Sequence, residues 1–237
     1  MTKPGKFIGI GVGPGDPELL TLKAIDILKH AAVIAVPYST PKQQSLALQT
    51  ARDYIKPQTR ILKLHFPMVK DEAVRQEHRL QAAEQIAEHL RSGEDVAFLT
   101  EGDPMLYSTF AYLLWHLEER FPIEIVPGIS SVMASAAQAH LPLATGDQRL
   151  AVLPANYENI DKLGAILALF DTVVLMKVHA VLEELIDYLA EKDLLAQAVL
   201  VERASAENCR VFTDLQSIER DQVSYLSQLI VSKNIFT

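Results

Sequence analysis

The first half of the chain alternates between two hydrophobic patterns. Short apolar runs, typical of strands buried on both faces of a parallel sheet, occur at 8–12, 31–36, 60–64, 95–100 and 123–126. Between them, apolar residues recur at the spacing of one helical face over 18–29, 45–55, 71–91, 109–119 and 132–139. This alternation of strand and helix predicts an α/β domain built on a parallel sheet.

The second half repeats this organisation on a smaller scale. We expect strands near 150–153, 172–176, 198–202 and 225–231, and helices near 160–169 and 180–191. With 142–147 interpreted as the linker, the chain is predicted to form two α/β domains, 1–142 and 147–237. The longest apolar run, 163–170, is far shorter than the ~20 residues of a membrane-spanning helix. No membrane association is therefore expected.

Three of the expected strands end in turns rich in glycine and proline. These turns begin at Gly13, Glu101 and Pro127. The carboxyl ends of parallel strands share one edge of a sheet, so we expect the three turns to lie side by side and to form a ligand site. Because glycine has no Cβ, it would let either a flat ligand or another backbone segment come within contact distance. An ordinary tight turn without a ligand is the alternative for the first of them.

The glycines do not match the common nucleotide-binding fingerprints. The dinucleotide pattern G-x-G-x-x-G requires a third glycine where this chain has Pro14, Asp16 or Glu18, depending on the register. The second strand also ends in Pro37 instead of an acidic residue. Neither the spacing nor the hydroxyl of a phosphate-binding loop is present. A nicotinamide-dependent oxidoreductase is therefore disfavoured.

Composition narrows the classes of function further. The net charge of −8 argues against a general nucleic-acid-binding protein, which needs a basic face to neutralise phosphates. The single cysteine, Cys209, cannot form an internal disulfide, and the histidines show no metal-ligand spacing, so no metal is expected. Lys3 and Lys6 precede a glycine-alternating segment, which lacks the apolar core of a secretion signal. A cytoplasmic protein is expected.

The three turns together resemble a known family. Gly-x-Gly-Pro-Gly-Asp-Pro-Glu-Leu-Leu-Thr at 11–21, Gly-Asp-Pro-x-x-Tyr at 102–107 and Val-Pro-Gly-Ile-Ser-Ser at 126–131 are similar to the motifs of tetrapyrrole methyltransferases. That family methylates corrin and porphyrin precursors with S-adenosylmethionine. The stretches 100–109 and 66–68 most resemble the enzymes that methylate carbon 20 of precorrin-2 or of its cobalt complex. Other members act on other ring carbons or on a modified histidine of an elongation factor.

The resemblance implies a fold, an assembly and a set of donor contacts. It implies two α/β domains with S-adenosylmethionine bound in a cleft between them, and a homodimer. The implied donor-binding residues are Pro14, Glu101, Gly102, Asp103, Leu106, Ser130, Ser131, Met176 and Ala204. Many relatives have glycine in place of Glu101 and of Ala204, so the chain departs from the pattern at these two positions.

Methyl transfer from a sulfonium depends mainly on positioning and on the exclusion of water. The absence of an evident Ser-His-Asp set agrees with this chemistry. Asp103 is the first catalytic candidate, with a helix cap as the alternative for its carboxylate. Tyr107 is the second, with a place in the core as the alternative.

The acceptor implied by the resemblance is a polycarboxylate, so cations should line its pocket. Arg75 and Arg79 lie one helical turn apart on one face and are the candidate substrate contacts, together with Gly13 and Gly15 of the first turn. Other basic residues near the expected strand ends are Arg149, Lys177, His179, Arg203 and Arg210. Most of these charges are expected to be solvated, with two or three facing the cleft.

Overall fold

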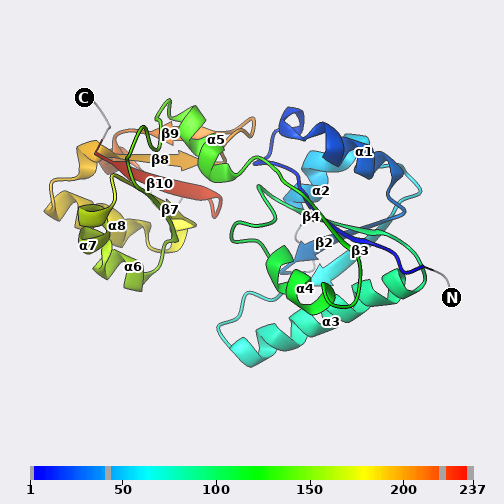
Figure 1. The fold of residues 1–237 in the computed structure, drawn as a ribbon. Coiled ribbons are helices and arrows are strands. Elements are labelled where there is room, and N and C mark those ends of the chain that lie inside the picture. The colour runs from blue at the N-terminus through cyan, green and yellow to red at the C-terminus, as the bar shows by residue number, and fades with distance from the viewer. Residues whose placement is uncertain (1–2, 41–43, 219–222, 234–237) are drawn as a thin grey trace. The chain divides into compact units, whose positions relative to one another are not determined.

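The computed structural model describes residues 3–40, 44–218 and 223–233, and the chain divides after Ser130 into two compact units. Each unit contains one five-stranded sheet with helices (Figure 1), so the prediction of two α/β domains is confirmed. The division precedes the linker predicted at 142–147. The reason is that helix α5 (Ser131–Gln138) packs on strands β8 (Ala198–Glu202) and β10 (Ser227–Ser232) of the second unit.

The first sheet is entirely parallel, in the order β3, β2, β4, β1, β5. Its strands are β1 (Phe7–Gly11), β2 (Val33–Tyr38), β3 (Arg60–His65), β4 (Val96–Thr100) and β5 (Ile123–Val126). Every residue of β1 and of β4 is buried, as the continuous apolar runs predict for the middle of a covered sheet.

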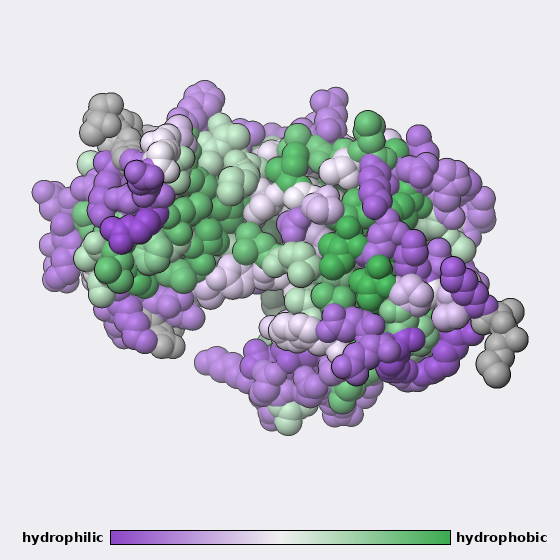
Figure 2. All heavy atoms as spheres, viewed as in Figure 1, coloured by the Kyte–Doolittle hydropathy of each residue, from purple (hydrophilic) through white to green (hydrophobic). Residues whose placement is uncertain are grey.

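Helices cover both faces of this sheet. On one face, α1 (Leu22–His30) and α2 (Leu46–Ala51) share a core with alternate residues of β1, β2 and β4. On the other, α3 (Glu72–Arg91) and α4 (Phe110–Leu117) pack around Phe7 and Phe98, and the Phe7 and Phe110 ring centroids lie 5.2 Å apart. Hydrophilic residues gather on the outer side of α3 (Figure 2).

The helix expected at 18–29 is two elements. Asp16 caps a short 3₁₀ turn, η1 (Pro17–Leu19), by accepting the Glu18 N–H at 2.8 Å. The α-helix α1 has its own cap, Thr21, whose hydroxyl accepts the Ala24 N–H at 3.2 Å. The side-chain caps Asp16 and Thr21 satisfy amide groups that a helix leaves unbonded at its start. A second 3₁₀ turn, η2 (Arg52–Tyr54), follows α2.

The second sheet is mixed, in the order β6, β7, β10, β8, β9. Strands β6 (Leu150–Pro154) and β7 (Thr172–Met176) are parallel, β10 runs antiparallel to β7 and β8, and β9 (Arg210–Phe212) pairs antiparallel with β8. The remaining elements are α6 (Tyr157–Asp161), α7 (Leu163–Leu169), η3 (Val178–Ala180), α8 (Leu182–Glu191), η4 (Leu195–Gln197) and η5 (Leu215–Ser217). Helices α7 and α8 share one apolar core with this sheet. Within the described residues, no helix is long and apolar enough to cross a bilayer.

Candidate functional site

The three glycine-containing turns of the first unit meet at one edge of the sheet. They follow β4, β1 and β5, which are adjacent strands in that order. The first and second turns are joined by two backbone hydrogen bonds, from Gly102 N to Gly13 O at 2.7 Å and from Gly13 N to Gly102 O at 3.3 Å. The expectation that the turns lie side by side is confirmed.

Two of the glycines are required because the turns touch through their backbones. A Cβ on Gly11 would lie 2.6 Å from the Gly102 carbonyl oxygen, and one on Gly128 would lie 2.2 Å from the same atom. Real Cβ atoms do not approach an oxygen so closely. Of the two uses expected for a missing Cβ, contact with another backbone segment is therefore the one found at these positions. Gly13 and Gly102 also have positive φ angles of 79° and 66°, which glycine adopts without strain.

Asp103 ties two of the turns together. Its carboxylate accepts the Met105 N–H at 2.8 Å through Oδ1 and the Gly128 N–H at 3.0 Å through Oδ2. Helix α4 begins later, at Phe110, and the Ser108 hydroxyl accepts the Phe110 N–H at 3.1 Å. The alternative that Asp103 caps this helix is thus wrong. The carboxylate holds the turn after β4 against the turn after β5.

Tyr107 lies outside the core. It has a φ of 50° and is 47% exposed, although the chain is about to enter helix α4. A positive φ is costly for a bulky side chain and is found where the surrounding structure demands it. The alternative that Tyr107 is a core residue is therefore wrong.

Glu101 is the second carboxylate at the turn after β4. Burial raises the pKa of its carboxyl above the ordinary value. Pro14, Leu106 and Ser130, three of the other implied donor contacts, are partly exposed on the three turns. The first unit thus places Pro14, Glu101, Gly102, Asp103, Leu106 and Ser130 on adjoining segments.

The second unit gathers the remaining implied contacts at one edge of its own sheet. Met176 ends β7 and Ala204 follows β8, and both are buried. Gln228, on the antiparallel strand between them, is the cross-strand partner of Met176, and its Nε2 donates to Ser131 Oγ at 2.5 Å. Gln228 therefore connects Ser131 of helix α5 with the ends of β7 and β8.

Gln228 and its neighbour Ser227 are residues that the sequence did not single out. Among the described residues, neither Gln228 Oε1 nor Ser227 Oγ has a hydrogen-bond partner, although both atoms are buried. Buried polar atoms are normally paired, so these two are available to a ligand. The only sequence feature that could have indicated them is the Ser-Gln pair before the apolar residues Leu229, Ile230 and Val231. A strand whose first residues are exposed to solvent would show the same pattern.

The backbone is strained beside these residues. Lys177 and Arg203, which follow β7 and β8 directly, have φ angles of 61° and 50°. Their N–H groups donate to Ser227 O at 3.0 Å and to Leu226 O at 2.8 Å. Such conformations cost about 1–3 kcal/mol each and gather at ligand sites. This edge of the second sheet is accordingly a good candidate for ligand contact.

Arg75 and Arg79, the candidate substrate contacts, lie in the first half of α3 and share one acid. Arg75 Nη2 lies 2.5 Å and Arg79 Nη1 2.6 Å from the Glu72 carboxylate. The Arg79 guanidinium also lies 3.7 Å above the centre of the Tyr112 ring, and its side chain is only 11% exposed. Both arginines have local partners.

The other basic residues show similar pairing on the second unit. Arg210 forms an ion pair with the buried Glu202, with Nε 2.7 Å from Oε2, and Arg203 Nε lies 3.7 Å from Glu202 Oε1. The Lys177 ammonium lies 5.8 Å from the centre of the Tyr225 ring. Arg203 and Arg210 thus share the Glu202 carboxylate at one edge of the second sheet.

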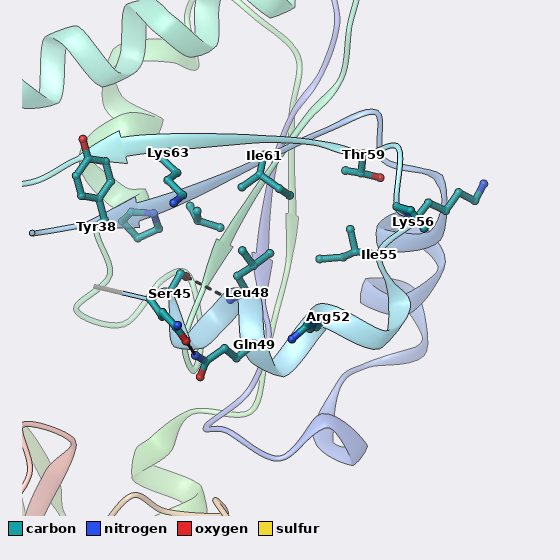
Figure 3. Close-up of a pocket in the computed structure, with 14 residues that line it drawn as sticks. Tyr38, Ser45, Leu48, Gln49, Arg52, Ile55, Lys56, Thr59, Ile61 and Lys63 are labelled. Atoms are coloured by element: carbon teal, nitrogen blue, oxygen red, sulfur yellow. Dashed lines mark hydrogen bonds between the residues drawn. The ribbon is translucent and has the colours of Figure 1, made fainter. Parts of the chain in front are cut away.

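A separate cavity of about 480 Å³ lies on the first unit between helix α2 and the edge strand β3. Lys63, Arg52 and Lys56 are among its lining residues, and the Lys56 side chain points away from the other labelled side chains (Figure 3). None of the residues predicted for the site lines this cavity. Within the described residues, no cluster of three His, Cys, Asp or Glu side chains could hold a metal ion.

Comparison with known proteins identifies relatives along nearly the whole chain. The precorrin-2 C(20)-methyltransferase of a Sinorhizobium species is 36% identical over 96% of this chain and 95% of its own length. The cobalt-precorrin-2 C(20)-methyltransferase of Salmonella typhimurium is 33% identical over 97% of each chain.

Solved structures share the fold at lower identity. A cobalt precorrin-4 methyltransferase matches 96% of this chain with a TM-score of 0.72 at 21% identity. A Thermus thermophilus uroporphyrin-III C-methyl transferase, solved with S-adenyl homocysteine, matches 96% with a TM-score of 0.66 at 22% identity. The family model for tetrapyrrole (corrin/porphyrin) methylases matches residues 6–219. The chain therefore belongs to the tetrapyrrole methylase family.

Proposed function

We propose that this protein transfers the methyl group of S-adenosylmethionine to carbon 20 of precorrin-2 or of cobalt-precorrin-2, a step in the synthesis of cobalamin. The observation that carries the proposal is the near full-length match to C(20)-methyltransferases of both kinds, at 36% and 33% identity. Family membership supports it at the level of the reaction class. Nothing favours the nicotinamide-dependent alternative.

The methyl donor is assigned to residues on both units. On the first unit they are Pro14, Glu101, Gly102, Asp103, Leu106 and Ser130, and on the second they are Ser131, Met176 and Ala204. We add Gln228 to the second group. The buried, unpartnered Gln228 Oε1 and Ser227 Oγ suit a ligand that carries amino or hydroxyl hydrogens, such as an adenosyl group. When bound, S-adenosylmethionine supplies an electrophilic methyl group on a positively charged sulfur.

The residues of the chain then bind, orient and exclude water. The backbone contacts among the three turns fix the rim of the site before any ligand arrives, which is the preorganisation that a displacement reaction requires. We propose that the Asp103 carboxylate also faces the cationic donor, and that the exposed Tyr107 ring packs against the acceptor.

The acceptor is a macrocycle with many carboxylates. We propose that Arg75 and Arg79 meet some of them, in competition with Glu72, and that Gly13 and Gly15 allow the flat ring to approach the first turn. The Tyr112 ring would keep the Arg79 guanidinium in place during this exchange of partners.

We further propose that the protein acts in the cytoplasm as a homodimer, as the family resemblance implies. The lone Cys209, which cannot form an internal disulfide, agrees with a reducing compartment. Sedimentation equilibrium at micromolar concentration measures the assembly state directly, and a monomer mass there would reject the dimer.

One experiment tests the reaction. The protein is incubated with methyl-labelled donor and either precorrin-2 or its cobalt complex, and the product is read by mass, visible spectrum and carbon NMR. A single methyl at carbon 20 is expected, and the faster of the two acceptors identifies the natural one. A methyl at another ring carbon would point to a different member of the family, and no methyl on either acceptor would reject the proposal.

A further inference from the structure

Glu101 is an acidic residue at the junction of the three turns, and its side chain takes no part in the hydrogen bonds that hold these turns together. It follows strand β4 directly, and the next residue, Gly102, exchanges two backbone hydrogen bonds with Gly13. Leu99, two residues earlier, is fully buried in the core beneath α1 and α2. The carboxyl group therefore lies at the end of a buried strand, beside the segment that the donor is proposed to contact.

The surroundings of Glu101 differ from those of Asp103. Both Asp103 oxygens accept backbone N–H groups, at 2.8 Å and 3.0 Å. Among the described residues, no hydrogen bond or ion pair reaches the Glu101 carboxyl group. The Asp103 carboxylate is thus already held by two backbone hydrogen bonds, whereas the Glu101 carboxyl group has none and can exchange a proton.

Burial is the single cause of the raised pKa of the Glu101 carboxyl. No charged group on the neighbouring described elements stabilises its ionised form, and the nearby Asp103 carboxylate is engaged by the Met105 and Gly128 amides. A partly desolvated carboxylate without partners is a stronger base than an ordinary one.

We propose that Glu101 is the base that removes the proton from the bridge carbon of the macrocycle after methyl transfer; this rests on the proposed function. Once the methyl carbon has bonded, the bridge carbon carries both the new methyl group and its original hydrogen. The Glu101 carboxylate takes that hydrogen as a proton, and the electron pair of the C–H bond returns to the conjugated ring. Glu101 then loses the proton to water, so the step needs no oxidant, reductant or further reactant.

The test compares Glu101→Gln with Glu88→Gln, a matched change on the exposed face of α3. Calorimetry with S-adenosylhomocysteine measures the donor-site affinity of both variants, and any loss of affinity in Glu101→Gln should be far smaller than its loss of rate. With acceptor deuterated at carbon 20, Glu101→Gln should lower the turnover rate ~10²-fold or more, as loss of a general base does. It should also show a larger deuterium isotope effect than the wild-type enzyme and should lose the decline in rate at acidic pH.

A second measurement does not depend on catalysis. Because the pKa of Glu101 is higher in the folded chain than its ordinary value of 4.5, the free energy of unfolding falls as pH rises through the range above 4.5. Glu101→Gln removes this dependence. The free energy of unfolding of Glu101→Gln, relative to that of the wild type, should rise from pH 4 to pH 8, and Glu88→Gln is measured beside it as the matched control.

The outcomes separate the two proposals. If the wild-type protein methylates neither acceptor, the proposed function and this role both fail. If the wild type methylates at carbon 20 and Glu101→Gln matches its rate, isotope effect and pH profile, only the role of Glu101 is overturned. A loss of donor affinity in Glu101→Gln as large as its loss of rate would also overturn it, because the side chain would then act only as a binding group.

Discussion

The two units present their candidate contacts in different ways. In the first unit, the site edge is built from backbone: three turns are bonded to one another, and two glycines are needed for their close approach. In the second, it is built from side chains at the ends of antiparallel strands, and two side chains of β10, Ser227 and Gln228, carry buried polar atoms without partners among the described residues. The first arrangement is complete within the protein, whereas the second leaves two buried polar atoms unpaired within the part of the chain that the structure describes. Changes in the first unit should therefore affect folding, and changes in the second should affect affinity.

The largest expected effect is that of Gly128→Ala. The new Cβ would lie 2.2 Å from the Gly102 carbonyl oxygen and would force the turns apart, so we expect a loss of about 3 kcal/mol in the free energy of unfolding. Urea denaturation measures it. Gly146→Ala is the control, because its Cβ meets open space and only its positive φ of 55° is unfavourable, which costs about 1 kcal/mol. Equal losses in the two variants would show that the turns are not tightly packed.

Asp103→Ala should have the next largest effect. It removes two hydrogen bonds to a charged acceptor and leaves the Gly128 N–H unpaired, so we expect a loss of about 2 kcal/mol in stability together with weaker donor binding. Asp214→Ala removes a comparable but exposed cap of η5 and should cost less than about 1 kcal/mol. A normal thermal midpoint in Asp103→Ala would contradict the role of this side chain as a tie between turns.

Gln228→Leu addresses the second unit. The change removes an unpartnered buried oxygen along with the bond to Ser131, so stability should change little. The affinity for S-adenosylhomocysteine should fall about tenfold, or about 1.4 kcal/mol. Calorimetry and urea denaturation of the same sample give the two quantities. A large loss of stability with unchanged affinity would mean that Gln228 serves the fold and not the ligand.

The sequence predicts the first unit better than the second, for physical reasons. Parallel strands buried on both faces leave continuous apolar runs, and their adjoining turns carry the glycines that close contact requires, so both strands and turns can be identified. Strand β9 has only three residues and is partly exposed, so it leaves no periodic signal. Helix α5 has an apolar face of small residues, and nothing in that pattern says which sheet it covers.

The sequence likewise predicts some residues of the candidate site but not the contacts that define their roles. Asp103 and Tyr107 were identified from a turn motif, but whether Asp103 caps a helix or ties two turns depends on a contact with Gly128, far along the chain. The importance of Gln228 depends on its cross-strand position beside Met176, which no local pattern encodes. The pairing of the strands determines the Asp103–Gly128 contact and the position of Gln228 beside Met176. Strand pairing is a property of the tertiary fold and cannot be read from a local pattern.

The smallest expected effect tests whether charge around the first sheet influences its turns. Glu124 on β5 accepts ion pairs from Lys23 and Lys6, both at 2.6 Å, and the hydrogen bonds from these lysines hold its pKa below the ordinary value of 4.5. A depressed pKa stabilises the fold above pH 4.5, and that contribution is lost as pH falls through the folded-state pKa. Glu124→Gln should therefore cost about 0.5 kcal/mol at pH 7, a value typical of exposed pairs. The difference in stability between Glu124→Gln and the wild type should vanish in acid and diminish in high salt. Donor affinity should not change, because backbone hydrogen bonds hold the turns and the Glu124 carboxylate takes no part in them. A loss of donor affinity in Glu124→Gln would show that the position of β5, and with it the third turn, depends on the surface charges as well as on the glycines.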